Sequence, residues 1–359
     1  MIKTLEKYLI TLFLKKILIV SVIFFTLIFI LNIFEEISFL KNTEANFFLP
    51  FLMTALNSPT ILFEIFPFIF LLATQFFYID LIEKGELDTL KINTINNFKL
   101  IKILFLSSFI LGLILLVIYY NFSSKLKFFY LEIKNKYSLD NKYLAAVNSN
   151  GLWIKDESDS FTYIINADKI DNEYLKDVSI SEFNKEFELI RIIESSKVNI
   201  KNFMWIIYNP KISFKKITKK ENKNIFIQTH FNKKKINNLF GNLKSLNIFR
   251  LIELKKDYKE LGYSTEEIDL EIQKLFSLPI YLSIMTIFSS IIMLNIKRNK
   301  PLIFHVFFGI FLSVLIYYFY YLLNLFGKSG KIPLSISVWL PLLILTIFIL
   351  IGLIRINEK

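Results

Sequence analysis

The sequence predicts an α-helical integral membrane protein with six transmembrane helices, arranged as three plus three, and a β domain inserted between the two groups. Three observations lead to this fold class. Six apolar stretches can each cross a bilayer, because a helix rises about 1.5 Å per residue and a hydrocarbon core is about 30 Å thick. Most charged residues lie in the middle of the 359-residue chain. That middle part also contains short runs of β-branched and aromatic residues, which are typical of strands.

The apolar stretches form two groups of three. They occupy residues 17–34, 56–79, 103–124, 275–296, 302–327 and 332–354. Five of them contain no Asp, Glu, Lys or Arg, and the second contains only Glu64. A soluble protein would interrupt such stretches with charges on its solvent-facing sides. We therefore expect two membrane halves, residues 1–124 and 275–359, around a domain formed by residues 125–274.

Basic residues near the ends of the spans predict the orientation, because Lys and Arg are retained on the cytoplasmic side. With the N-terminus inside, the inner segments hold thirteen Lys and Arg residues, whereas the short outer segments hold Lys41, Lys328 and Lys331. We therefore expect both termini to be cytoplasmic and residues 125–274 to lie on the far side. The amphipathic stretch from Tyr8 to Lys16 is expected to lie along the inner surface.

Glu64 is the one carboxylate within a predicted span. An intramembrane carboxylate is by default a functional candidate, although water would reach one near the outer end of the span. Pro59 and Pro67 lie in the same span, where neighbouring helices can satisfy the carbonyl groups that proline leaves free.

The segment between the second and third spans predicts a short amphipathic helix over about residues 80–99. Apolar side chains recur there at roughly helical spacing, at Leu81, Leu87, Leu90 and Ile95, and charged residues fill most other positions. Two interpretations remain open at this point. The helix could lie on lipid as an ordinary interfacial helix, or it could dock a cytoplasmic partner.

The middle domain predicts strands followed by a helical return. Its runs of β-branched and aromatic residues lie at 152–154, 161–165, 187–193, 205–208 and 211–214. Strands at such intervals suggest a sandwich or jelly roll. Its apolar faces could enclose an ordinary core or form a slot for an acyl chain. Helical periodicity returns at about 243–274 with a break at Gly262, so two short helices are expected there.

The composition excludes several kinds of chemistry. The chain has no cysteine, which excludes disulfides, thiolate metal sites and Cys nucleophiles. Only two histidines, His230 and His305, argue against a His-based metal centre. The net charge of +12 does not indicate nucleic-acid binding, because no basic stripe interleaved with aromatics lies on a soluble segment. We expect no catalytic residue, cofactor or metal.

Five motifs follow one another in an order that matches a known family. They are Pro59 with Phe66-Pro67, Glu86-Leu87 with Leu90-Lys91, Gly151-Leu-Trp-Ile-Lys155, Leu275-Phe-Ser-Leu-Pro279, and Gly327 to Pro333 with Trp339-Leu-Pro341. Together they resemble the lipopolysaccharide-export permeases LptF and LptG (YjgP/YjgQ). The segment from Gly151 to Lys155 is more similar to LptG. The chain departs from the family pattern at Lys91, where Arg is usual, and at Thr94-Ile95-Asn96, which replaces Gly-[IV]-Ser.

The resemblance implies one half of an ABC-type exporter. Such a permease extracts lipopolysaccharide from the inner membrane of a Gram-negative bacterium and passes it to a periplasmic bridge of β jelly rolls. The inserted domain would be one such jelly roll. The chain would pair with an LptF-like permease, two copies of the cytoplasmic ATPase LptB would drive the pair, and an LptC-like bitopic protein would join them.

The resemblance also implies site residues. Glu86 would pair with a basic residue of the ATPase, Leu87 and Leu90 would fill apolar pockets, and Lys91 belongs to the same segment. Lys41, just outside the first span, could meet lipid phosphates through charge-assisted hydrogen bonds, or it could be an interfacial anchor. Glu64 is the second lipid-binding candidate.

Three other classes of protein compete with this interpretation. An ABC-linked mechanotransmission protein typically has four spans. A membrane sensor with a ligand-binding β domain would need a cytoplasmic output domain, and no inner segment is large enough to be one. A lipid-modifying enzyme would need acidic or His clusters at a membrane face, where the sequence offers only Glu35 and Glu36.

Overall fold

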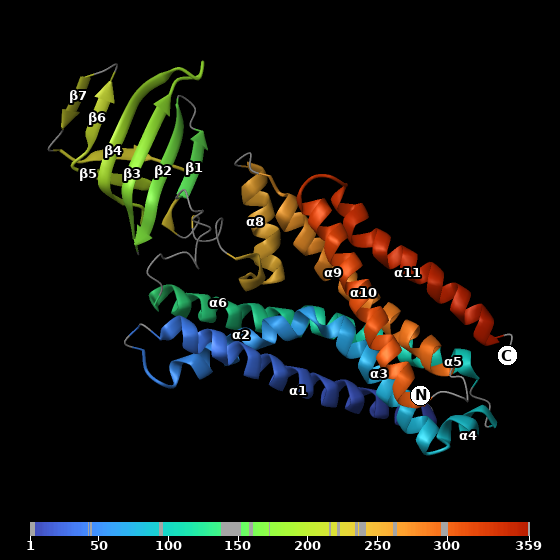
Figure 1. Cartoon of the computed structure of the whole chain (residues 1–359). Helices are drawn as coiled ribbons and strands as arrows, with labels where there is room; N and C mark the ends of the chain where they lie inside the picture. Colours follow the sequence, from blue (N-terminus) through green and yellow to red (C-terminus); the bar gives the residue numbers. More distant parts are fainter. Residues whose placement is uncertain are drawn as a thin grey trace. The chain divides into compact units, whose positions relative to one another are not determined.

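The computed structural model consists of two compact units (Figure 1). The first, called the membrane unit, comprises Met1–Asn42, Asn46–Lys127 and Glu266–Lys359, and the second, called the β unit, comprises Thr43–Ala45 and Phe128–Thr265. The structure describes residues 4–41, 43, 45–92, 96–137, 152–157, 161–171, 173–214, 217–220, 223–233, 236, 242–260, 264–295 and 301–357. The membrane unit is therefore assembled from the two ends of the chain.

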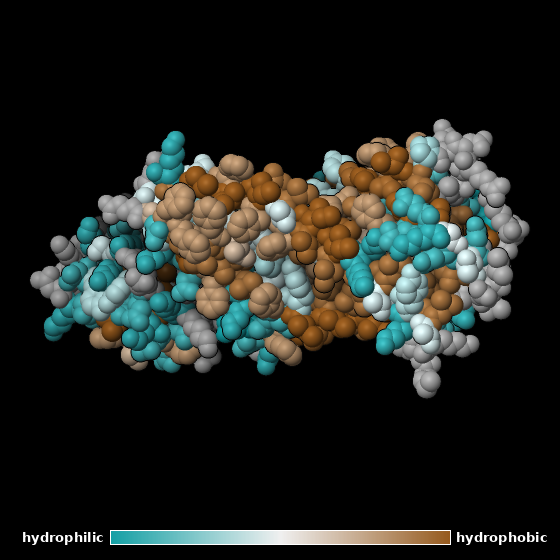
Figure 2. Space-filling model, turned by 90° about the horizontal axis from the view of Figure 1, so that it is seen from below, coloured by the Kyte–Doolittle hydropathy of each residue, from teal (hydrophilic) through white to brown (hydrophobic). Residues whose placement is uncertain are grey.

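Six helices of the described chain are long and apolar enough to cross a membrane. They are Thr4–Leu40, Phe66–Glu83, Asn97–Tyr137, Glu266–Leu294, Leu302–Lys328 and Leu334–Ile356. Their three-plus-three order around an inserted sheet confirms the predicted fold class. Exposed apolar side chains form the broad brown surface in the middle of Figure 2, which is expected of a surface that faces lipid.

The first two spans differ in detail from the prediction. Helix α1 (Thr4–Leu40) is continuous, so the stretch from Tyr8 to Lys16 belongs to the same helix as the first span and is not a separate element. The second span is divided at Ile65 into α2 (Leu49–Glu64) and α3 (Phe66–Glu83). Pro67 lies in the first turn of α3, where its missing N–H group costs no helical hydrogen bond.

The third and fourth spans are longer than predicted. Helix α5 (Asn97–Ile114) continues through a π-helical turn, η1 (Leu115–Tyr119), into α6 (Tyr120–Tyr137). Of the two expected return helices, α8 (Ile248–Glu260) is separate, and the other is the beginning of α9 (Glu266–Leu294). The expected break at Gly262 lies outside the described residues. Helices α10 (Leu302–Lys328) and α11 (Leu334–Asn357) complete the unit.

Small residues let the helices of the membrane unit approach closely. Helix α9 packs against α3, α5, α10 and α11. A Cβ atom added at Gly112 would lie 2.7 Å from the Pro279 Cα of α9, which is closer than packed atoms approach. A Cβ at Gly309 would likewise overlap the Gln75 side chain. Such close contacts are how helices associate in lipid, where no hydrophobic effect drives them together.

The β unit is built on one antiparallel sheet. Its strands are β1 (Leu152–Glu157), β2 (Thr162–Asp171), β3 (Tyr174–Phe183), β4 (Leu189–Asn199), β5 (Met204–Tyr208), β6 (Lys211–Phe214), β7 (Ile217–Lys220) and β8 (Ile225–Gln228). The order is β1-β2-β3-β4-β5-β8, and β6 pairs with β4 and β7. This sheet confirms the predicted inserted β domain. Strand β3 was missed because Asp177, at φ 51°, interrupts its alternation, while β7 and β8 are only four residues each.

The inward faces of the strands form an apolar core. Its members are less than 10% exposed and include Leu152, Ile154, Ile165, Leu175, Val178, Ile180, Ile193, Val198, Trp205, Ile207 and Ile227. Successive inward positions lie two residues apart on β1, as expected for a strand with one buried face. This pattern is typical of an ordinary core filled by side chains.

Candidate coupling and lipid-contact sites

A tight turn at one end of the membrane unit introduces the candidate coupling helix. Helix α3 ends at Glu83, and the Gly85 backbone then adopts φ 67°, a left-handed conformation that favours glycine. Helix α4 (Glu86–Ile92) follows, and the Asn96 side chain caps α5 by accepting from the Lys99 N–H at 2.9 Å. The expected helix over 80–99 is thus divided, because the glycine turn ends α3 and the Asn96 cap begins α5. Residues 93–95 lie outside the described part.

The side chains of α4 differ in their exposure. Leu90 is 6% exposed and packs within its own unit. Glu86 and Leu87 are half-buried, and Asp88 is exposed. Lys91 lies in the last turn of α4, but its side chain is outside the described part. Glu86 and Asp88 in the first turn match the positive end of the helix dipole.

Two polar contacts join α1 to this end of the unit. The Tyr8 hydroxyl donates to the Glu86 Oε2 atom at 2.8 Å. The Lys16 Nζ atom lies 2.7 Å from the Asp80 Oδ2 atom near the end of α3. Lys16 was expected to end the amphipathic stretch and to be one of the basic residues of the inner side, with no partner assigned to it. These partners lie far apart in the sequence, so no local pattern could have paired them.

The two lipid-contact candidates lie on different helices. Lys41 is exposed directly after the end of α1. Glu64 is also exposed and is the last residue of α2. Helix α3 begins two residues after Glu64 and rises about 26 Å to Glu83, close to the thickness of a hydrocarbon core. Because α1 extends to Leu40, two further carboxylates, Glu35 and Glu36, also lie within a long apolar helix, where Glu35 is exposed and Glu36 is fully buried.

A polar and aromatic layer that the sequence did not predict lies between α2 and the third span. The Lys127 Nζ atom donates to the Asn57 Oδ1 atom at 2.6 Å. The Tyr119 hydroxyl, in the π-helical turn, donates to the Pro59 carbonyl oxygen at 3.1 Å. Polar residues of the apolar second span, such as Asn57 and Thr60, were the available signal.

A row of polar side chains crosses one end of the β-unit core. Asp156, Tyr163, Glu182 and Arg191 lie directly opposite one another on strands β1 to β4. The Arg191 Nε atom is 2.6 Å from the Glu182 Oε2 atom. Burial raises the pKa of Tyr163, the negative charge of Glu182 adds to this rise, and Arg191 partly offsets it. The row therefore places two carboxylates, which are almost fully buried, beside cationic or hydroxyl partners.

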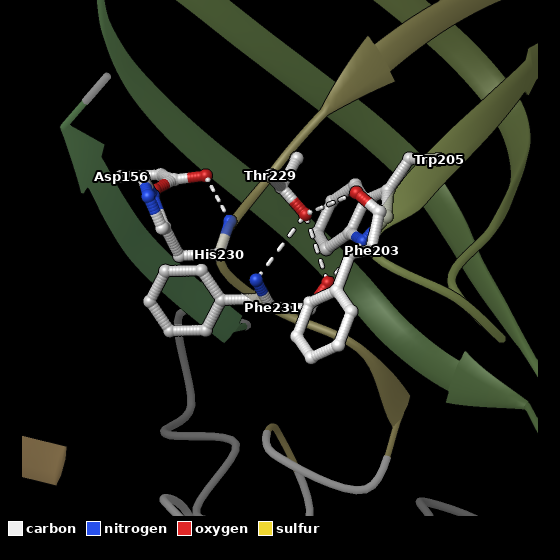
Figure 3. Close-up of polar contacts among 6 residues, drawn as sticks. All are labelled: Asp156, Phe203, Trp205, Thr229, His230 and Phe231. Carbon is white, nitrogen blue, oxygen red and sulfur yellow. Dashed lines mark hydrogen bonds and ion pairs between the residues drawn. The ribbon is translucent and has the colours of Figure 1, made fainter. Parts of the chain in front are cut away.

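His230, which follows β8, bonds to Asp156 at the β1 end of this polar row (Figure 3). The His230 Nδ1 atom lies 2.7 Å from the Asp156 Oδ1 atom, and the His230 backbone N–H donates to Asp156 Oδ2 at 3.1 Å. The Trp205 Nε1–H group donates to the Phe231 carbonyl oxygen at 2.7 Å. These bonds tie the last strand to β1 and β5, so His230 serves the fold. Among the described residues, no group of three or more His, Cys, Asp or Glu side chains could hold a metal ion.

A protein-family model identifies the family to which this architecture belongs. The family model described as lipopolysaccharide export system permease LptF/LptG matches residues 7–355. The chain belongs to the LptF/LptG family. No curated protein sequence matches it. As an LptF/LptG permease, the chain is a multi-pass membrane subunit of the lipopolysaccharide-export ABC transporter and is not itself catalytic. Membership in this family excludes the mechanotransmission, sensor and enzyme alternatives.

Proposed function

We propose that this permease lies in the inner membrane of a Gram-negative bacterium with both chain termini and α4 in the cytoplasm. The excess of Lys and Arg at one end of the spans supports this orientation. The starts of α1 and α5 and the end of α11 all lie at the same end of the unit as α4 (Figure 1). The β unit then projects into the periplasm, where it forms one element of a bridge for lipopolysaccharide.

The proposed coupling site is α4. In this proposal Glu86 pairs with a basic residue of an LptB-like ATPase, Leu87 enters an apolar pocket, and Lys91 lies at the edge of the contact. Leu90, which packs within its own unit, anchors α4. The first turn of α4, in which Glu86 and Leu87 are half-buried and Asp88 is exposed, lies between membrane helices α3 and α5, and this placement is the observation that carries the assignment. ATP-driven closure of the ATPase then becomes a rigid-body push on the helices attached to α4.

Reversing the charge of Glu86 tests the coupling site. We expect Glu86→Lys to uncouple ATP hydrolysis from lipopolysaccharide transfer in the reconstituted transporter, because the carboxylate would no longer attract its basic partner. The variant should stay folded, since Glu86 is only half-buried. Asp88→Lys, an exposed site on the same helix, is the matched control. Normal transfer by Glu86→Lys would defeat the assignment.

The proposed assembly contains an LptF-like second permease, two copies of LptB and an LptC-like bitopic protein. In it, this chain takes the LptG position, as supported by the segment Gly151-Leu-Trp-Ile-Lys155. Within that segment Leu152 and Ile154 are buried in the core, while Trp153 is exposed. Isolation of the tagged chain in mild detergent, followed by identification of the co-purifying ATPase, permease and lipid, tests this composition.

Lys41 is the proposed contact for lipid phosphates, and Glu64 is a candidate acceptor for sugar hydroxyl groups. A photoreactive residue at Phe47, which is 86% exposed and follows Lys41 in the same connection between α1 and α2, can report on lipid at this connection. We expect Lys41→Glu to reduce crosslinking to lipopolysaccharide because the anionic phosphates are then repelled. Lys331→Glu is the control on another hairpin of the same membrane face. Unchanged crosslinking would make Lys41 an interfacial anchor.

A further inference from the structure

We propose that the first half of α1, together with α3 and α4, forms one rigid lever, and that Tyr8, Lys16 and Asp80 are the positioning residues that hold it. The inference rests on the proposed coupling role of α4. It adds that force entering at α4 is delivered to α1 as well as to α3. The contacts between these helices carry the argument.

The apolar contact between α1 and α3 is continuous. Phe13 is fully buried, and its ring meets the rings of Phe70 and Phe77 edge-on at centroid distances of 6.5 and 5.9 Å. Leu9, one turn earlier on α1, is also fully buried. Edge-to-face aromatic contacts have a preferred geometry, so they resist sliding better than aliphatic contacts do. The start of α1 is therefore fixed on α3.

The two polar contacts fix α1 at different levels. Lys16 pairs with Asp80 on α3, and Tyr8, about 12 Å of helical rise away, bonds to Glu86 on α4. The side chains of Lys16 and Asp80 are only 19% and 25% exposed, so water screens this ion pair less than it screens a surface pair. A single polar contact would let α1 rotate about it. Two polar contacts at different levels prevent rotation of α1 about the α3 axis.

The turn between α3 and α4 explains why a second connection is needed. Gly85 has no side chain to restrict the turn, and a Cβ atom added there would meet nothing within 4 Å. A push on α4 could therefore bend this turn and be lost. The Tyr8–Glu86 hydrogen bond and the buried Leu90 brace α4 against α1 and α3, so the push moves all three helices together.

A charge swap in the complete reconstituted transporter tests the lever. The variants are Lys16→Glu, Asp80→Lys and the double variant, and the readout is lipopolysaccharide transferred per ATP hydrolysed. Each single variant should lower this ratio at least five-fold while the ATPase stays bound, and the double variant should return it to within two-fold of the original protein. Lys15→Glu, an exposed neighbour, is the control. Single variants with an unchanged ratio, or a double variant no better than the singles, would overturn the proposal.

A crosslink provides a second test, because the chain has no native cysteine. The double variant Lys16→Cys with Asp80→Cys should be poorly coupled, and joining its thiols with a short bis-maleimide should restore the transfer ratio. A crosslinked protein that stays uncoupled contradicts the lever. The Glu86→Lys variant separates the two proposals. If Glu86→Lys uncouples transport while the Lys16 and Asp80 variants leave the ratio unchanged, the lever alone is wrong. If Glu86→Lys transports normally, the coupling site is wrong.

Discussion

The two units handle buried polar groups differently. In the membrane unit, buried hydroxyl groups donate to carbonyl oxygens one turn back in their own helix, as Ser58 does to Thr54 at 2.7 Å and Ser283 to Pro279 at 2.8 Å. In the β unit, ionisable groups pair across strands, as Arg191 does with Glu182 at 2.6 Å. Most buried hydroxyl groups of the membrane unit thus bond within their own helix, whereas the ionisable groups of the β unit pair between strands.

This difference follows from the surroundings of each unit. Charges are expensive in hydrocarbon, and the Lys328–Glu267 pair accordingly joins the end of α10 to the start of α9, while Asp80 of the Lys16–Asp80 pair lies near the end of α3. Its helices are held together by close packing of their side chains. Force from the ATPase is expected to enter where charged residues reach water. The β unit is held by an apolar core together with a polar row. Helix packing should therefore dominate the stability of the first unit, and the Asp156 pair should matter most in the second.

The largest expected effect is at Gly112. Leucine at this position would overlap the Pro279 backbone, which cannot move aside as a flexible side chain can, so we expect a loss of roughly 3 kcal/mol or more in stability. Thermal unfolding in detergent measures it. Gly352→Leu is the matched control, because a Cβ there meets only the Ile291 side chain. Equal losses at the two glycines would contradict the shape argument.

Removal of the Asp156 carboxylate should have the next largest effect. Asp156 is 1% exposed, and its carboxylate accepts from the His230 backbone N–H and faces the His230 ring. Asp156→Ala leaves these two groups without their acceptor, so it should lower the stability by about 1–3 kcal/mol. Hydrogen exchange at β1 and β8 in the full chain measures the loosened closure. Glu194→Gln, at an exposed position on β4, should leave exchange unchanged.

The hydroxyl pair between Ser108 and Thr286 should matter less. Their oxygens lie 2.8 Å apart between α5 and α9. A double-mutant cycle with Ser108→Ala and Thr286→Ala should give a coupling energy of about 0.6 kcal/mol, the average for such bonds in membranes. If this coupling energy exceeded that of the Asp156–His230 pair, polar contacts would contribute more to the membrane unit than to the β unit, which is the opposite of what we expect.

The smallest effect is visible only at alkaline pH. Burial and the Glu182 charge raise the pKa of Tyr163 above its ordinary value of 10.0. The stability that this group contributes is therefore fully present below pH 10 and is lost as the pH rises through the raised pKa. The tyrosinate absorbance difference between the original protein and Tyr163→Phe should have its midpoint above 10. A midpoint at or below 10 would mean that Tyr163 is exposed to water and is not buried beside Glu182.

The parts of the fold predicted from the sequence are those that local patterns determine. Six spans and the inserted strands follow from the exclusion of charge from hydrocarbon and from strand periodicity. The break at Ile65 and the early turn at Gly85 were missed, because Pro67 and Gly85 are each compatible with more than one helix boundary. The contacts of Glu86 with Tyr8 and of Asp156 with His230 join residues more than 70 positions apart, which no periodicity reveals.

The most direct test of the central claim is the release of lipopolysaccharide from proteoliposomes that contain the complete transporter. A permease powered by a separate ATPase predicts transfer to a soluble periplasmic acceptor only when ATP and the ATPase are both present, and no ATP hydrolysis by this chain alone. ATP hydrolysis by the isolated chain, or no lipopolysaccharide transfer by the complete transporter, would contradict the account.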